Sequence, residues 1–296
     1  MKHAFIHDHR EQFDVGVMCA VFDIAPAGYY ARQERPESDR ATRARELTAQ
    51  IRLVHAESRG VYGSIKITKA LRHRHRKLNT KTVARLMAAA GIRSKVARKF
   101  RVQTTDSRHD NPIACNTLDR KFTVEAPNTV WVSDITYIHT DEGFVYLAGV
   151  MDLFSRKIVG WSIDHTMTTD LVEKALDAAI RTRRPIVGGG GSEGAGGGLL
   201  HHSDRGVQYT SERYRQQLRD NGIQASMSRT GNCYDNAVME SFWGKLKSEM
   251  VYHERFATLA QARAAVFDYI EAFYNRTRIH ATLGYLSPEQ FEAARA

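Results

Sequence analysis

The sequence predicts an α/β protein in which a five-stranded mixed sheet with flanking helices follows an all-α module. Two observations support this prediction. Apolar residues recur at helical spacing through a very basic stretch that ends near residue 95, and from residue 129 onward β-branched and aromatic runs alternate with helical patterns. The expected regions are an N-terminal segment (1–40), a helical module (41–95), a polar connector (96–128), an α/β core (129–255) and a helical extension (256–296).

Composition limits the classes of protein that the chain can be. With 296 residues and 42% hydrophobic content, it can bury a substantial core, so wholesale disorder is excluded. The net charge of +10 favours a polyanionic partner, most simply nucleic acid, although a solvated basic surface is the alternative. The three cysteines form no CxxC pair, which argues against a disulfide framework and a zinc ribbon. No signal peptide or long apolar run is present, so we expect a cytoplasmic protein without membrane spans.

The basic region 41–95 contains three expected helices. The first carries an apolar stripe over residues 47–54, and the third begins after Asn79, a good N-cap residue, and ends near Gly91. Lys81 and Arg85 lie four residues apart on the third helix and share its polar face. Three short helices with a basic last helix resemble a helix-turn-helix module that binds DNA. A small bundle with a solvated basic face is the alternative.

The core region has a definite order of elements. The pattern predicts strands at 130–138, 144–151 and 157–163, a helix at 168–183, a strand at 199–202, a helix at 211–220, a strand at 223–227 and a helix at 236–250. This order is the one expected of an RNase H-like α/β core. Residues 187–198 contain eight glycines but lack the Lys-Ser/Thr ending of a phosphate-binding loop, so they are interpreted as a flexible loop.

Two aspartates occupy positions that favour a ligand site. Asp134 lies inside an apolar strand, where an unpaired carboxylate costs several kcal/mol and so needs a partner. That partner is either a metal ion or an arginine. Asp204 follows a strand end, where ligands of α/β sheets bind, although a turn aspartate that bonds its own backbone is the alternative.

Glu240 provides a third carboxylate. It lies on the 236–250 helix at the edge of the apolar stripe, on the same side as Lys247, and an ordinary surface pair is the alternative. Three carboxylates can share two hard cations, which support in-line phosphoryl transfer by activating the attacking oxygen and stabilising the leaving one. Lys247 and neighbouring basic residues can then hold phosphates.

Several longer segments make the pattern specific. They are 130–138 (VWVSDITYI), 151–156 (MDLFSR), 202–209 (HSDRGVQY), 228–237 (SRTGNCYDNA), 240–247 (ESFWGKLK), 274–280 (YNRTRIH) and 283–285 (LGY). Together they resemble the integrase-core transposases of bacterial insertion sequences, of the OrfB type in the IS-three family. Asp204 and Glu240 have 35 residues between them, which is the spacing of that family's acidic triad. The glycine-rich loop departs from the family pattern, because it widens the spacing between Asp134 and Asp204.

The resemblance implies a chemistry and a set of residues. It implies two Mg²⁺ or Mn²⁺ ions, DNA cleavage that leaves a 3′-OH, and attack of that 3′-OH on another phosphodiester. Asp134 and Asp204 are the implied metal ligands, and Glu240 completes the site. The residues expected to contact DNA are Lys247, Lys245, Lys81, Arg85 and Arg205.

The implied partners are transposon ends and target DNA, further copies of the chain, and an upstream-encoded helix-turn-helix and coiled-coil segment. Two alternatives stay open at this point. One is a non-catalytic DNA-binding regulator built on residues 41–95, and the other is an RNase H-like nuclease that acts on hybrids or junctions.

Overall fold

The computed structural model describes residues 1–34, 37–73, 78–96, 112, 114–118, 123–185, 198–228 and 236–295. Most of the predicted connector lies outside these residues, as does the predicted glycine-rich loop apart from Gly198. Part of the 228–237 segment also lies outside them.

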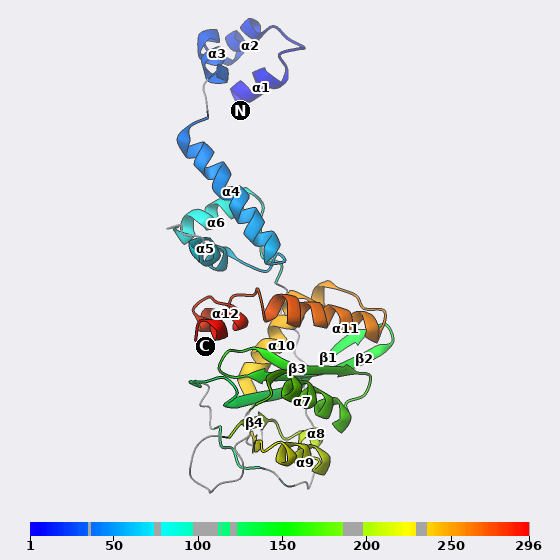
Figure 1. The fold of residues 1–296 in the computed structure, drawn as a ribbon. Helices are drawn as coiled ribbons and strands as arrows, with labels where there is room; N and C mark the ends of the chain where they lie inside the picture. Colours follow the sequence, from blue (N-terminus) through cyan, green and yellow to red (C-terminus); the bar gives the residue numbers. More distant parts are fainter. Residues whose placement is uncertain are drawn as a thin grey trace.

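The first 34 residues form three helices, α1 (Lys2–Asp8), α2 (Val15–Phe22) and α3 (Pro26–Glu34), for which the sequence analysis made no specific prediction. They enclose a small core of their own that contains Ile6, Met18, Cys19 and Tyr29. Figure 1 shows this unit at the end of the molecule, beyond the N-terminal end of α4.

The predicted three-helix module is present as α4 (Asp39–Glu57), α5 (Ser64–His73) and α6 (Thr80–Ala89). The Asn79 side chain caps α6 by accepting a hydrogen bond from the Lys81 backbone N–H at 2.8 Å. Gly91 follows α6 with a φ of 69°, the left-handed conformation that glycine adopts at helix ends. Lys81 and Arg85 are both exposed, as their spacing predicts.

The core contains the predicted five-stranded mixed sheet, with the strand order β3-β2-β1-β4-β5. The strands are β1 (Val130–Thr140), β2 (Gly143–Asp152), β3 (Ile158–Asp164), β4 (Leu200–Ser203) and β5 (Gln224–Met227). β1, β2 and β3 pair antiparallel, whereas β4 runs parallel to β1 and β5 runs parallel to β4. The RNase H-like fold class is therefore confirmed.

Helices cover both faces of this sheet (Figure 1). One core contains Trp131 of β1 together with α7 (Thr169–Arg183), α8 (Val207–Thr210) and α9 (Glu212–Asp220). The other core contains Val132 of β1 together with α10 (Ala237–Glu249) and α11 (Leu259–Phe267). The alternation of β1 side chains between two buried faces thus matches the period of two expected of a central strand.

Close packing fixes α7 on β3. A Cβ added at Gly160 would lie 2.3 Å from the carbonyl oxygen of Ala175 and 2.4 Å from the backbone nitrogen of Ala179. Backbone cannot yield at such distances, so only glycine fits where this helix crosses the strand.

The C-terminal extension returns to the helical module. After α11 it forms the π-helical segment η3 (Asp268–Tyr274), the 3₁₀ segment η4 (Ala281–Leu283) and α12 (Pro288–Ala293), and a short 3₁₀ segment, η2 (Val251–His253), lies before α11. The Tyr62 hydroxyl accepts a hydrogen bond from the Ile279 backbone N–H at 2.7 Å, and Arg59 forms an ion pair with Asp268. One hydrophobic core therefore runs from the module through the extension to the sheet. In the part of the chain that the structure describes, no helix is long and apolar enough to cross a membrane.

Candidate active site

Asp134 lies half-buried on β1, the strand against which α10 packs. The indole N–H of Trp243 donates a hydrogen bond to its Oδ2 atom at 3.1 Å. Among the described residues, no arginine or lysine forms an ion pair with this carboxylate. Among these residues, Asp134 therefore lacks the arginine partner that was the alternative to a metal ion.

The electrostatic environment of Asp134 is unfavourable for its charge. Burial raises its pKa well above the usual value, and the negative charges of Asp204 and, less strongly, Glu240 raise it further. Hydrogen bonds from the Ile135 backbone and from Trp243 oppose this shift without cancelling it. The fold thus brings Asp204 and Glu240 within electrostatic reach of Asp134.

Asp204 reaches Asp134 because of the parallel pairing of β4 with β1. Val132 is paired with His202, so the residue that follows β4 lies level with the middle of β1. The Asp204 Oδ1 atom accepts a hydrogen bond from the Gly206 backbone N–H at 2.9 Å, which is the turn bond expected of an aspartate at this position. The structure therefore shows the turn bond, and the charge of this carboxylate also acts on Asp134.

Glu240 is exposed in the first turn of α10. Within the described residues, no three His, Cys, Asp or Glu side chains are gathered closely enough to enclose a metal ion. Asp134 on β1 and Asp204 after β4 lie on neighbouring strands, and Glu240 lies on the helix α10.

Lys247 lies two turns farther along α10. Its ammonium nitrogen is 4.0 Å from the centroid of the Tyr137 ring, a cation–π contact that fixes the direction of the side chain. Burial lowers its pKa to about 8, although the charge of Asp134 acts in the opposite direction. Lys247 is therefore close to Asp134, as its predicted role requires.

The other residues predicted to contact DNA lie in different surroundings. The Lys245 ammonium donates to the Ser241 hydroxyl at 2.9 Å, and the Arg205 Nε atom donates to the Ser228 carbonyl oxygen at 2.6 Å. Lys81 and Arg85 belong to the module and are not brought to the acids.

Two buried histidines on β4 support the site, and the sequence analysis missed them. His201 lies between the Ser133 hydroxyl at 2.7 Å and the Tyr214 hydroxyl at 3.0 Å. Burial lowers its pKa to about 3, so its ring is neutral at physiological pH. The ring nitrogens of His202 lie 2.9 Å from the Ser226 hydroxyl and 3.2 Å from the Ser228 hydroxyl. These contacts tie β4 to its neighbours and hold Asp204 level with Asp134.

Two further residues were also missed: Trp243 on α10, and Asn236 directly before this helix. The Asn236 side-chain amide donates to the Ser133 carbonyl oxygen at 3.1 Å, which fixes the start of α10 against β1. An indole among apolar residues and an asparagine before a helix are common in any sequence, so only the fold reveals what they contact.

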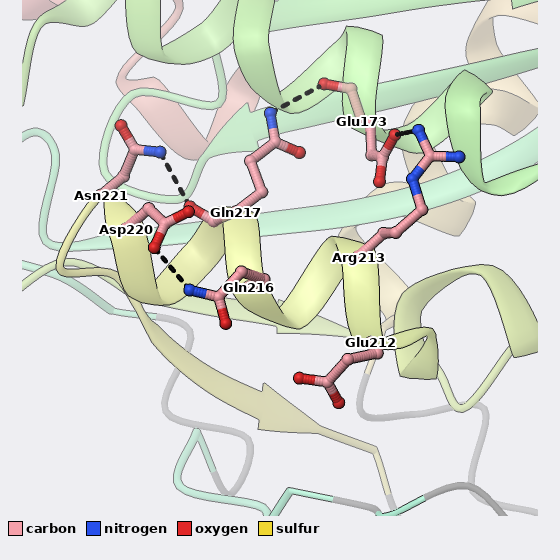
Figure 2. Close-up of a pocket in the computed structure, with 7 residues that line it drawn as sticks. All are labelled: Glu173, Glu212, Arg213, Gln216, Gln217, Asp220 and Asn221. Carbon is pink, nitrogen blue, oxygen red and sulfur yellow. Dashed lines mark hydrogen bonds and ion pairs between the residues drawn. The ribbon is translucent and has the colours of Figure 1, made fainter.

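A surface hollow lies elsewhere, between α7 and α9 (Figure 2). Its side chains bond to each other and to nearby backbone: Arg213 pairs with Glu173, Gln216 with Asp220, and the amide of Gln217 donates to the Glu173 carbonyl. None of the acids of the candidate site lines this hollow, so it is not part of the candidate active site.

Comparison with known families gives matches in both halves of the chain. An integrase core domain family matches residues 124–233, a second integrase core domain family matches residues 240–295, and an HTH-like domain family matches residues 42–100.

Individual proteins are similar over nearly the whole chain. An uncharacterized 31 kDa protein of insertion element IS600 from Shigella sonnei is 42% identical over 274 residues, which are 93% of this chain and 97% of that protein. Transposase InsF for insertion sequence IS3A from Escherichia coli strain K12 is 39% identical over 295 residues, which are 99% of this chain and 98% of that protein.

Solved structures show a weaker likeness. The simian T-cell lymphotropic virus intasome in complex with the PP2A regulatory subunit B56 gamma has a TM-score of 0.46 at 15% identity, covering 82% of this chain and 74% of that chain. The HTLV-2 integrase catalytic core domain in complex with magnesium, in its trimeric form, has a TM-score of 0.41 at 16% identity, covering 56% of this chain and 97% of that chain.

Proposed function

The chain belongs to the family of transposases of IS3-type insertion sequences, and from this premise we propose that Asp134, Asp204 and Glu240 form its catalytic site. One observation supports the assignment above all others. Asp134 is half-buried beside Asp204 without an ion-pair partner among the described residues, and the charges of Asp204 and Glu240 oppose its ionisation. A fold retains such a cluster of like charges where something of opposite charge binds.

Divalent metal ions fit this set of donors. Carboxylate oxygens are the ligands that Mg²⁺ and Mn²⁺ prefer, and the fold places the Asp204 carboxylate close enough to Asp134 for its charge to raise the pKa of Asp134. Two bound ions would activate the attacking oxygen and stabilise the leaving oxygen of an in-line displacement. Asp134 and Asp204 are the proposed ligands, and Glu240 completes the set when its side chain turns toward them.

The protein's own groups orient the reactants. The Trp243 indole fixes Oδ2 of Asp134, and the Gly206 N–H fixes Oδ1 of Asp204, so each aspartate has one oxygen set by the fold. Lys247 is proposed to hold a phosphate of the DNA strand next to the scissile bond. In the first step water is the nucleophile and a 3′-OH is released. In the second step that 3′-OH attacks a target phosphodiester, so one bond is broken for each bond that is formed.

DNA binding is proposed to involve the exposed face of α6 with Lys81 and Arg85, together with Lys245, Lys247 and Arg205 near the acids. We also propose that copies of the chain assemble on transposon ends, and that an upstream-encoded helix-turn-helix and coiled-coil segment assists end recognition. The proposed place of action is the cytoplasm, on the bacterial chromosome. We also propose that the chain divides at the boundaries predicted from its sequence, into residues 1–40, 41–95, 96–128, 129–255 and 256–296.

The test of the catalytic site is strand transfer with Mg²⁺ on a supercoiled plasmid that carries the element's ends. Asp204→Asn keeps the size of the side chain and its bond to Gly206, but removes a ligand charge. We expect it to abolish 3′-end cleavage and strand transfer while DNA binding persists. Near wild-type activity of this variant would refute the proposed site. Cleavage of RNA–DNA hybrids without strand transfer would instead favour the nuclease alternative.

A further inference from the structure

The far end of the β1–β2 hairpin carries three aromatic rings that contact one another. His139 of β1 is paired with Phe144 of β2, and their ring centroids are 5.4 Å apart. Tyr137 lies two residues before His139, and therefore on the same face of the strand, with its ring centroid 5.3 Å from that of Phe144. Both rings stand nearly perpendicular to Phe144, at interplanar angles of 89° and 86°. We call Tyr137, His139 and Phe144 the aromatic strip.

The aromatic strip lies at the surface. Phe144 is 53% exposed, His139 is exposed and Tyr137 is half-buried. None of these three residues belongs to a hydrophobic core of the described part of the chain. Single exposed apolar residues are ordinary, but a row of contacting rings on one face indicates a surface that binds something.

Contacts with the segment that leads into α11 hold this end of the hairpin in place. The Arg255 Nε atom donates to Oδ1 of Asp141 at 2.9 Å, and the Asp141 backbone N–H donates to the Phe256 carbonyl oxygen at 2.9 Å. The Leu259 backbone N–H donates to Oε2 of Glu142 at 3.1 Å. Figure 1 shows the hairpin beside α11. Both acids of the turn are therefore engaged, and the rings next to the turn have a fixed support.

The aromatic strip begins beside a cation of the candidate active site. The Lys247 ammonium nitrogen lies 4.0 Å from the centroid of the Tyr137 ring, and Lys247 makes no ion pair among the described residues. Tyr137 follows Asp134 by three positions on β1, which corresponds to about 10 Å along the strand. The proposed metal ligand, the lysine and the exposed rings thus follow one another along the same side of the core.

From this arrangement we propose that the aromatic strip stacks an unpaired base of the DNA strand that passes the acids, next to the phosphate held by Lys247. The inference rests on the proposed function, because it requires that this strand be bound at Asp134. Proteins bind single strands with cations that hold the backbone and with ring faces that stack on bases of any sequence. In a duplex the neighbouring pairs cover each base, so a ring beside the site of cleavage selects a strand whose end has opened.

Charge favours this occupant over a second copy of the chain. The strip begins at a lysine, and the chain carries a net charge of +10, so a polyanion complements this surface better than another copy of the same basic chain does.

The experiment measures the affinity of the full chain, without Mg²⁺, for a short duplex and for the same duplex with mismatched terminal pairs. Wild type should prefer the mismatched duplex. Phe144→Ala should lose about fivefold or more of its affinity for the mismatched duplex and bind the paired duplex as wild type does. Phe144→Trp should keep the preference because it keeps a ring, whereas Phe144→Leu should lose it although the side chain stays apolar. Phe13→Ala is the matched control, because Phe13 is 58% exposed and lies in the N-terminal unit.

A base analogue gives a second readout. With 2-aminopurine in the mismatched segment, stacking on the strip should quench its fluorescence in wild type and in Phe144→Trp, but not in Phe144→Leu. Melting temperatures of the variants should stay near that of wild type, because the ring at position 144 is more than half exposed.

Three results would overturn the proposal. The first is an equal loss of affinity for both duplexes in Phe144→Ala, and the second is a preference that Phe144→Leu keeps. The third is a fall in the sedimentation coefficient of DNA-free Phe144→Ala with an unchanged duplex preference, which would make the strip a contact between copies of the chain. The measurement needs neither Mg²⁺ nor cleavage, so a failure of the catalytic proposal, detected as strand transfer by Asp204→Asn, leaves it intact.

Discussion

At the scale of single residues, burial of Asp134 disfavours the negative charge that its proposed role as a metal ligand requires. Its folded pKa is raised, so the folded chain binds this proton more tightly than the unfolded chain does. The stabilisation from this carboxyl is complete below the unfolded pKa near 4 and is lost as the pH rises through the folded pKa. At neutral pH without metal, this carboxyl therefore destabilises the fold, because the unfolded chain can ionise it freely and the folded chain cannot.

We predict that Asp134→Asn raises the melting temperature of the metal-free chain at neutral pH while it abolishes strand transfer. Asparagine keeps an oxygen that can accept the Trp243 hydrogen bond, but it carries no charge to be repelled. The gain should disappear below about pH 3, where the aspartate is protonated in both states. Asp164→Asn is a control for a surface aspartate, since Asp164 is 38% exposed and pairs with Lys174. A loss of stability in Asp134→Asn at neutral pH would contradict the prediction.

Trp243 gives a second prediction at this scale. Its ring is packed so closely on β2 that a Cβ added at Gly149 would lie 2.9 Å from the indole Cη2 atom. Trp243→Phe keeps most of this packing but removes the N–H that fixes Asp134. Losing one hydrogen bond to a charged group costs about 1.5–3 kcal/mol, so we expect Mg²⁺ affinity to fall by about tenfold or more.

The measurement is the rise in melting temperature with increasing Mg²⁺, compared with strand-transfer rates. Trp161→Phe is the matched control, because the Trp161 indole also donates to a carboxylate, Glu271, at 2.9 Å, but away from the acids. If both variants lose the same Mg²⁺ response, the effect of Trp243 is structural and the orienting role is wrong.

At the scale of elements, α6 presents the exposed basic face that the sequence predicts. Lys81→Ala together with Arg85→Ala should weaken DNA binding and reduce the salt slope by about two phosphate contacts. Both side chains are exposed, so melting should change little. Lys174→Ala together with Arg181→Ala on α7 is a control of equal charge, because these cations already pair with Asp164 and Asp177. An unchanged salt slope in the double variant would place the DNA-binding face of the module elsewhere.

The elements of the core could be predicted because their patterns are strong. β1 and β2 are long, β-branched and buried on at least one face, and the apolar stripe of α10 has a regular helical period. The helices of residues 1–34 gave no such signal. Their core consists of a few residues from three short segments, and the Asp14 side chain that caps α2 is also typical of a loop.

The residues of the proposed site also differ in how far the sequence could predict them. Asp134, Asp204 and Glu240 were proposed from their residue types, their positions in the pattern and the family's motifs. The residues that orient them were missed, because their contacts join positions about a hundred residues apart, as in Trp243 with Asp134 and Asn236 with Ser133. Such pairings are set by sheet order and helix placement, which local periodicity does not contain.

At the scale of the whole molecule, the module and the catalytic core share one hydrophobic core. The sequence suggested separate regions for residues 41–95 and 256–296, but the structure packs one on the other through Tyr62, Arg59 and the η3 segment. A DNA-binding module fixed in this way presents its ligand in a constant orientation to α10. It should also unfold together with the core rather than before it.

Tyr62→Phe tests this coupling. The change removes the hydroxyl that accepts the Ile279 N–H and that lies 3.4 Å from the Thr277 carbonyl oxygen, so a buried N–H loses its partner. Such a loss costs about 1–3 kcal/mol and should lower the melting temperature by a few degrees in a chain of this size.

All three tryptophans, Trp131, Trp161 and Trp243, lie in the core, so their fluorescence reports on the core alone. We expect tryptophan fluorescence and helical circular dichroism to shift together, with Tyr30→Phe, an exposed tyrosine of α3, as the unaffected control. An early loss of helix with an unmoved fluorescence transition would mean that the module unfolds independently of the catalytic core.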